Sequence, residues 1–338
     1  MMKKISILLL AAAAVFCGCA QTAPVGKNES EKRYIEAFVQ ANYPKAQKTT
    51  LGSYIISSVP GTGAVAGDAD TSPFVRVRYD VYDLSGNIQA TTEKAVAQRI
   101  GTFKENYFYG PVTWYRQQNS LYAGLNEIVS TMKVGGKVNA IIPGWLITYD
   151  NYATAREYEE NSTGTTARYE LTLVDRISDI KTWEIDSIGR YIGHNFSFWS
   201  VADSLELGMY YFPTKGPTDT AHYAADSTFY INYIGRLLNG TVFDTNIKDT
   251  AKLYGLYNPK GTYAPKKVKM ATELKDIKMS DNSVINGFAR ALKQMRHFEA
   301  GTAIFNSTWG YGTSGSGSAI PAFSPLRFDI EIVKNTSD

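Results

Sequence analysis

The residue types that most often carry out chemistry are sparse in this chain and form no familiar constellation. The three histidines, His194, His222 and His297, share no metal-ligand spacing, and both cysteines lie within the first 19 residues. A zinc or iron centre therefore lacks ligands, and we expect neither a metal nor a cofactor. No serine occupies the strand-to-helix turn that exposes the nucleophile of α/β-hydrolases, so hydrolase chemistry has no support either.

Spacing and charge exclude two further kinds of site. Gly310, Gly312 and Gly315 match the G-x-G-x-x-G fingerprint, but the 23 residues that follow are too few for a dinucleotide-binding βαβ unit of about 30 residues. The chain has 35 Lys and Arg against 32 Asp and Glu, a near balance that argues against a nucleic-acid partner. Aromatic residues make up 13% of the chain. They fit a packed core, with a glycan-stacking surface as the alternative.

The N-terminus predicts export and a membrane anchor. Lys3 and Lys4 precede an apolar run over residues 5–16, which has the form of a secretory signal and is too short to span a bilayer. The run ends at Gly18 and Cys19, which resembles the bacterial lipoprotein signal and implies cleavage before Cys19 and lipidation of its thiol. A buried N-terminal helix with two incidental cysteines is the alternative.

The anchor sets the expected compartment. A lipid on Cys19 implies contact with a membrane of the bacterial cell envelope. Residue 20 is alanine and not the aspartate that holds lipoproteins at the inner membrane in some bacteria, so we expect the outer membrane. No cysteine follows Cys19, and the mature fold must be stable without disulfides.

Beyond the anchor, the chain repeats one order of elements. Tyr79 and Tyr233 lie in alternating segments 154 residues apart, and strand-like segments begin at Tyr169 and Phe328, 159 residues apart. Each copy has one short amphipathic helix between these strands. We therefore expect an α+β fold of two like domains, each a twisted antiparallel β-sheet, or half-barrel, curled around one short α-helix. The expected organisation is a signal peptide at 1–18, a tether with a short helix at 19–44, and domains at 45–180 and 181–338.

Motifs of the second copy carry a family resemblance. They are NGTVFD at 239–244, VINGF at 284–288, GYG at 310–312 and FDIEIV at 328–333. In this order, over about the last 130 residues, they resemble an FKBP-type peptidyl-prolyl cis-trans isomerase. The resemblance implies a half-barrel whose concave face is an aromatic pocket for a prolyl side chain, and it implies the same fold, without an intact pocket, for the first copy.

The resemblance also assigns site residues. It implies that Ile285 offers its backbone N–H to a substrate carbonyl, that Tyr311 offers its hydroxyl to another, and that Asp244 polarises the pocket edge. Phe288 stands where the family usually has tryptophan, which predicts a roomier, still apolar floor. The expected catalytic residues are Tyr233, Phe243, Asp244, Tyr311 and Phe328, and the expected substrate-binding residues are Val284, Ile285, Phe288 and Ile320.

Several departures from the family pattern surround this predicted pocket. About twenty additional residues, rich in lysine, lie between Asp244 and Val284, and the usual strand aromatic is replaced there by Ile277 or Met279. The lysines are interpreted as a solvated surface, with substrate contact as the alternative. The Gly- and Ser-rich flap at 313–318 is predicted to be mobile.

The first copy keeps the scaffold and loses the pocket residues. Gln89 and Ala90 take the places of Phe243 and Asp244, and Thr148 takes the place of Tyr311. Tyr149 follows one residue later and would point to the opposite face if the segment were extended. We interpret the first domain as a non-catalytic spacer, interaction surface or chaperone arm, with a rearranged active pocket as the alternative.

The sequence thus predicts an envelope-anchored isomerase that accelerates folding of exported, proline-containing polypeptides. Isomerisation moves no proton and needs no nucleophile. The absence of a hydrolase-type nucleophile motif from the sequence is therefore compatible with this activity. The alternative is a non-catalytic envelope lipoprotein that binds polypeptide or glycan through FKBP-like domains, with its pocket blocked by the insertion or weakened by Phe288.

Overall fold

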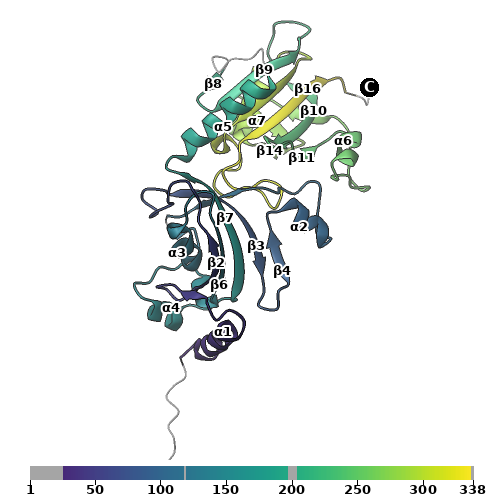
Figure 1. Ribbon diagram of the computed structural model, residues 1–338. Coiled ribbons are helices and arrows are strands. Elements are labelled where there is room, and N and C mark those ends of the chain that lie inside the picture. The colour runs from purple at the N-terminus through teal and green to yellow at the C-terminus, as the bar shows by residue number, and fades with distance from the viewer. Residues whose placement is uncertain (1–25, 118, 197–203, 336–338) are drawn as a thin grey trace, which may run out of the picture.

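The computed structural model describes residues 26–117, 119–196 and 204–335. It is an α+β structure in which each half of the chain forms its own antiparallel sheet, and the two sheets lie one above the other in Figure 1. This arrangement confirms the predicted fold class. The signal peptide and Cys19 lie outside the described residues, whose helices are all too short or too polar to cross a membrane.

The first sheet runs in the order β1-β2-β6-β7-β3-β4, with β5 beside β3, over the described residues. Its strands are β1 (Gln47–Lys48), β2 (Tyr54–Val59), β3 (Phe74–Tyr82), β4 (Ile88–Thr91), β5 (Val112–Tyr115), β6 (Lys137–Ile142) and β7 (Ala167–Ile177). Alternating residues of β3 and β7 face the core: Val75, Val77, Leu171 and Leu173 are fully buried or nearly so. The period-two pattern therefore sets which face of this sheet is covered.

Helix α3 (Ala123–Thr131) covers that face with Leu125, Ile128 and Val129. Helix α1 (Glu29–Asn42) adds Ile35 and Val39 to the same core, so the short helix that follows the tether packs against the first domain. The remaining elements of this half are α2 (Lys94–Arg99), α4 (Ala155–Asn161) and the 3₁₀ turn η1 (Gly144–Leu146). These elements add to the single helix that the sequence predicts for this half.

The second sheet runs in the order β14-β13-β12-β10-β16-β15-β9-β8, with β11 beside β10, within the described residues. Its strands are β8 (Ser204–Glu206), β9 (Met209–Lys215), β10 (Thr228–Leu237), β11 (Val242–Thr245), β12 (Lys266–Lys269), β13 (Lys278–Met279), β14 (Asn282–Ser283), β15 (Ala300–Phe305) and β16 (Leu326–Val333). Its helical elements are α6 (Lys248–Leu253), α7 (Asn286–Gln294), η3 (Leu274–Asp276) and η4 (Ser307–Trp309). Phe288, Ala291 and Leu292 of α7 are buried against the sheet.

A longer helix, α5 (Ile180–Asn195), joins the halves. Asp179 caps it by accepting the N–H groups of residues 181 and 182. Ile188 and Ile192 pack against Tyr210, Phe212 and Ile304, forming a separate hydrophobic cluster on the second sheet. Helix α5 therefore belongs to the second domain by packing, although its first turn follows directly on β7 of the first (Figure 1).

The loop from Gly310 to Pro325 leaves the second sheet and reaches the first domain; it contains the predicted flap segment 313–318, and the whole loop is called the flap from here on. Phe323 of the flap is 8% exposed and packs edge-to-face on Phe74, with 5.1 Å between ring centroids. The N–H of Phe108 in the first domain donates to the carbonyl of Ser318 at 2.9 Å. The flap, which runs between the sheets in Figure 1, is therefore held from both domains. Its predicted mobility stays a prediction.

Candidate functional site

Four aromatic rings of the second domain meet on the face of the sheet that α7 covers. They come from β10 (Tyr233), β11 (Phe243), α7 (Phe288) and β16 (Phe328). The Phe328 centroid lies 5.0 Å from that of Phe288 and 5.5 Å from that of Phe243, and the Tyr233 centroid lies 5.7 Å from that of Phe288. All three pairs are near perpendicular, the geometry that aromatic rings prefer. The structure thus brings together these four aromatic residues, which the sequence predicts as part of the site. We call them the ring cluster.

A β-bulge between β10 and β11 orients the residues of this ring cluster. Gly235 pairs with Asp244, and Arg236 pairs with Val242, which leaves Phe243 as the extra residue. A Cβ atom on Gly235 would lie 2.6 Å from Cε2 of Phe243 and 2.8 Å from Cε1 of Phe328. Glycine at this position therefore makes the space in which the two rings meet.

The polar edge of the site is built around Asp244. The Tyr233 hydroxyl donates to Oδ2 of Asp244 at 2.7 Å, and the Asp244 side chain is exposed. Burial, then the negative charge of Asp244, raises the pKa of Tyr233, and the same two causes raise the pKa of Tyr311. Both hydroxyls therefore keep their protons at neutral pH. Tyr233 is 5% exposed and Tyr311 is 36% exposed, so Tyr311 is the hydroxyl that solvent can reach.

Aliphatic residues close the other sides. Val284 and Ile285, half-buried, pack against the second core, and Ile320 of the flap is 3% exposed in the same core. Ile285 directly precedes α7, at the end of a helix where backbone N–H groups have no intrahelical partner. The predicted substrate-binding residues therefore border the ring cluster, and Ile285 lies at a helix terminus suited to bind a carbonyl oxygen.

One residue that sequence reasoning did not single out organises this region. Asn246 is 4% exposed, accepts the N–H of Tyr233 at 2.8 Å and donates to the carbonyls of Ile231 and Ala264 at 3.0 and 2.9 Å. It therefore ties the insertion to the strand that carries Tyr233. Its position two residues after Asp244 is the sequence signal that could have found it.

The insertion contributes aliphatic residues to the second core. Tyr257 and Tyr263 of the insertion stack on each other, with centroids 5.5 Å apart. Ile277 is fully buried in the second core, and Met279 packs against that core. The buried Val268 on β12 also belongs to it. Aliphatic side chains, rather than an aromatic from the insertion, thus line this part of the domain.

The first domain repeats the backbone of the site with other side chains. Val81 pairs with Ala90, and Tyr82 pairs with Ile88, which leaves Gln89 as the extra residue of an equivalent bulge. Gln89 turns outward and donates to Asp83 at 3.2 Å. The counterpart of the second-domain site therefore lacks both the ring of Phe243 and the carboxylate of Asp244.

The orientation predicted for Tyr149 required an extended segment, and the segment is not extended. Its ring lies against Tyr122, with centroids 4.6 Å apart, and a hydrogen bond with Tyr122 raises the pKa of Tyr149. Burial, together with the nearby Tyr122, Tyr79 and Tyr149, raises the pKa of Tyr169 to about 12. The segment before Tyr149 is the turn η1 followed by bends, so alternation along an extended strand does not apply. The first domain thus gathers Tyr79, Tyr122, Tyr149 and Tyr169 in this region.

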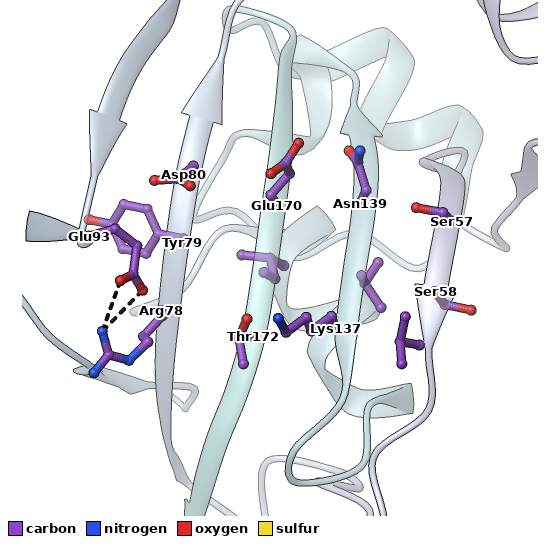
Figure 2. A pocket seen from close by; sticks show the side chains of 13 residues that line it. Ser57, Ser58, Arg78, Tyr79, Asp80, Glu93, Lys137, Asn139, Glu170 and Thr172 are labelled. Atoms are coloured by element: carbon purple, nitrogen blue, oxygen red, sulfur yellow. Dashed lines mark hydrogen bonds and ion pairs between the residues drawn. The ribbon is translucent and has the colours of Figure 1, made fainter. Parts of the chain in front are cut away.

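Several hollows of the described residues lie outside the ring cluster, and two of them bear on the first domain. One, of about 580 Å³, lies between the domains and is lined by Tyr79 and Trp114 of the first and by Ser318 and Pro321 of the flap. The other, of about 460 Å³, lies on the outer face of the first sheet (Figure 2). Most of the residues that line the outer hollow are polar or charged, as expected of an exposed sheet face.

Several charged side chains lie close together on the outer face of the first sheet. Arg78 pairs with Glu93 at 3.0 Å, and Asp80 lies directly opposite Glu170 across β3 and β7 (Figure 2). Burial raises the pKa of Asp80, the hydrogen bond from Thr91 opposes this, and the charge of Glu170 adds to it. Among the described residues, no group of three His, Cys, Asp or Glu could hold a metal ion.

Comparison with known proteins finds similarity in the second domain. Residues 220–333 match the model of the FKBP-type peptidyl-prolyl cis-trans isomerases. The chain is 31% identical over 110 residues to the macrophage infectivity potentiator of Trypanosoma cruzi, covering 32% of this chain and 44% of that protein. It is 27% identical over 132 residues to FK506-binding protein 2 of Dictyostelium discoideum, covering 39% of this chain and 80% of that protein.

Solved structures give further similarities. The three FKBP domains of wheat FKBP73 align over 83% of this chain and 94% of theirs, with 15% identity and a TM-score of 0.30. A peptidyl-prolyl cis-trans isomerase of Pseudomonas syringae aligns over 45% of this chain and 93% of its own, with 20% identity and a TM-score of 0.31. The matched residues 220–333 include the ring cluster, Asp244, Tyr311 and Ile320, so the similarity to the FKBP-type peptidyl-prolyl cis-trans isomerases extends over the candidate site.

Proposed function

We propose that this protein catalyses cis–trans isomerisation of prolyl peptide bonds in polypeptides and that the second domain is the catalytic one. The observation that carries the proposal is the ring cluster with Asp244 and Tyr311 at its edge. Its floor is buried and its rim is exposed, as a site for an apolar ring on a polypeptide requires. The family match of residues 220–333 supports the same reaction.

The proposed mechanism needs only solvation and orientation. Rotation about the amide meets a barrier of about 18–20 kcal/mol because resonance must be broken. The planar amide is more dipolar than the twisted one, so a site that replaces water with aromatic rings favours the twist. A thousandfold acceleration requires about 4 kcal/mol of this preference. A few ring contacts and one or two hydrogen bonds suffice.

Each polar group has a proposed part in holding the substrate. Ile285 offers its N–H to one substrate carbonyl, at the start of α7. Tyr311 offers its hydroxyl to another, because burial keeps this group protonated. Asp244 fixes the hydroxyl of Tyr233 and makes one edge of the apolar site negative. The prolyl ring packs between Phe243, Phe288 and Phe328 in this arrangement.

A prolyl-peptide isomerisation assay on the full-length chain tests the proposal. We expect a rate well above buffer at micromolar protein, and a fall of about three- to tenfold in kcat/KM for Tyr311→Phe, since one hydrogen bond is removed. Tyr149→Phe, in the first domain, is the matched control and should leave the rate unchanged. A wild-type rate equal to buffer would remove the proposed activity.

The binding-only alternative depends on a blocked pocket. The insertion would supply the block if one of its rings filled the cluster, whereas Tyr257 and Tyr263 stack on each other. Asp244 is exposed and Tyr311 is partly so. These observations favour turnover over binding alone.

We further propose that the protein is anchored in the bacterial cell envelope, at the outer membrane, through a lipid on Cys19. The support is the sequence pattern before Cys19 and the alanine at position 20. Exported polypeptides are then the substrates, and the first domain is a spacer or an arm that contacts them. Cys19→Ala should release the protein from the membrane fraction into the soluble one. Continued membrane association would contradict the anchor.

A further inference from the structure

A buried carboxylate from the joining helix holds the turn that precedes Tyr311. Glu184 of α5 is 2% exposed and Ser307 is 3% exposed. The N–H of Ser307 donates to Oε2 of Glu184 at 2.6 Å, and its hydroxyl donates to Oε1 at 2.7 Å. Burial raises the pKa of Glu184, and the two bonds from Ser307 oppose this. A carboxylate this deep is costly to bury unless it is hydrogen-bonded, so Ser307 is its necessary partner.

Ser307 in turn fixes the backbone on both sides of Tyr311. Its carbonyl accepts the N–H of Gly310 at 2.9 Å and the N–H of Gly312 at 2.9 Å. Tyr311 lies between these two donors. A single carbonyl therefore sets where the backbone of Tyr311 lies, and the position of that carbonyl depends on Glu184.

The same turn of α5 is attached to the first domain. The indole N–H of Trp183 donates to Oδ2 of Asp175 on β7 at 3.1 Å, and the guanidinium of Arg76 on β3 lies 4.6 Å from the Trp183 ring. Adjacent residues thus face different partners: Trp183 contacts the first domain, and Glu184 contacts the second. One turn of α5 therefore makes both contacts: Trp183 contacts the first domain, and Glu184 contacts the segment before Tyr311.

We propose that Glu184 is a positioning residue for isomerisation, which acts through Ser307 to place the Tyr311 hydroxyl toward the substrate carbonyl. This rests on the proposed function of the second domain. Glu184 lies outside residues 220–333, the part of the chain that matches the family model.

A double-mutant cycle with the full-length chain tests the proposal. Glu184→Gln keeps the size of the side chain but replaces one acceptor oxygen with a donor group, which faces the donors of Ser307. We expect kcat/KM for a prolyl peptide to fall about three- to tenfold in this variant. In a chain that already carries Tyr311→Phe, Glu184→Gln should cause no further loss, because the two residues act as one unit. An equal loss in both backgrounds overturns the proposal, as does an unchanged rate.

A second buried carboxylate of the same domain supplies the matched control. Glu299 is 1% exposed, accepts the N–H of Arg296 at 2.8 Å and accepts the Tyr211 hydroxyl at 3.1 Å. Glu299→Gln should destabilise the fold, measured by Tm, at least as much as Glu184→Gln. Any loss of activity it causes should be the same with Tyr311 and with phenylalanine there. If Glu299→Gln also shows coupling to Tyr311, the effect is one of general stability and the proposal fails.

A readout without activity separates this proposal from the function on which it rests. Glu184→Gln should speed amide hydrogen exchange at Gly310 and Gly312, and leave exchange in β10 and β16 unchanged. If the wild-type chain has no isomerase activity but this exchange pattern appears, the proposed function fails and the link from Glu184 to the turn stands. Unchanged exchange at both glycines overturns the link. If Glu184→Gln does not fold, Ser307→Ala removes only the hydroxyl bond and carries the same measurements.

Discussion

The ring cluster of the second domain and its counterpart in the first have the same backbone and different contents. In both domains a strand pairs with the next one through a bulge, two residues after a tyrosine: Gly235 pairs with Asp244, and Val81 pairs with Ala90. The glycine leaves room for two rings, whereas the first domain has a valine at this position. The comparison teaches that strand pairing supplies the scaffold, and that side-chain volume at one bulge determines whether a site can exist.

Charge separates the two sites as clearly as volume does. Tyr233 donates to the carboxylate of Asp244, and that charge contributes to its raised pKa. The pKa of Tyr79 is raised by burial alone, because Ala90 offers no charge. The first domain therefore has an apolar tyrosine without the polar edge that would orient a substrate amide.

The largest effect is expected from giving the second domain the first domain's side chain at the bulge. Gly235→Val places carbon atoms where Phe243 and Phe328 meet, within 2.6 and 2.8 Å of their ring atoms. We expect kcat/KM to fall by about 100-fold or more, close to 3 kcal/mol, because the rings must part. Overpacking should also cost about 1–3 kcal/mol of stability, measured by denaturant unfolding.

The reverse change is the control for that comparison. Val81→Gly opens space beside Tyr169 in the first domain, but Gln89 and Ala90 supply neither a second ring nor a carboxylate there. We expect no gain of activity and a stability loss of about 1 kcal/mol from glycine in a strand. A chain that keeps full activity with valine at 235, or that gains activity from Val81→Gly, would break the comparison.

An intermediate effect is expected at the extra residue of each bulge. Phe243→Ala removes one wall and admits water beside the prolyl ring, which should lower kcat/KM about tenfold, or about 1.4 kcal/mol. Gln89→Ala at the equivalent position should leave the rate unchanged, because Gln89 points away toward Asp83. The prolyl-peptide assay on both variants, with Tm measured in parallel, decides this. A large loss from Gln89→Ala would show that the first domain is the active one.

The smallest effect is expected on the outer faces of the sheets. Asp80 faces Glu170, whereas the equivalent pair in the second domain is Ile234 with Asp329, which contacts Arg236 and Arg327. Asp80→Asn keeps an acceptor for Thr91 and removes the repulsion between Asp80 and Glu170. We therefore expect the free energy of unfolding to rise by at most about 0.5 kcal/mol at pH 7.

The pH dependence of that gain follows from the raised pKa of Asp80. A carboxyl whose pKa is higher in the folded state binds its proton more tightly there, so the stability it contributes is lost as pH rises through that pKa. The advantage of Asp80→Asn should therefore be present at pH 7 and absent near pH 3, where Asp80 is protonated. Unfolding curves at both values measure it. An advantage that persists unchanged at pH 3 would rule out repulsion as its cause.

Local patterns predicted the fold class but only part of the site. Period two placed Tyr79 and Tyr233 on covered faces, and the motif NGTVFD gave the strand pair that contains the bulge. The orientation of Tyr149 could not be predicted, because the 3₁₀ turn η1 follows β6 and Tyr149 does not lie on an extended strand. The hydrogen bond between Glu184 and Ser307 could not be predicted, because the two residues are 123 positions apart and share no periodic pattern. The roles of Ile285 and Tyr311 stay predictions, and Cys19 lies outside the described residues.

The contact of Phe323 with Phe74 has a consequence for any attempt to separate the two halves. Without the first domain, the flap would expose the ring of Phe323 to water, next to Pro321 and Ala322. These residues would form an exposed apolar patch. An excised C-terminal half should thus self-associate as concentration rises. The first domain would then act as a cover that keeps the second domain from self-associating.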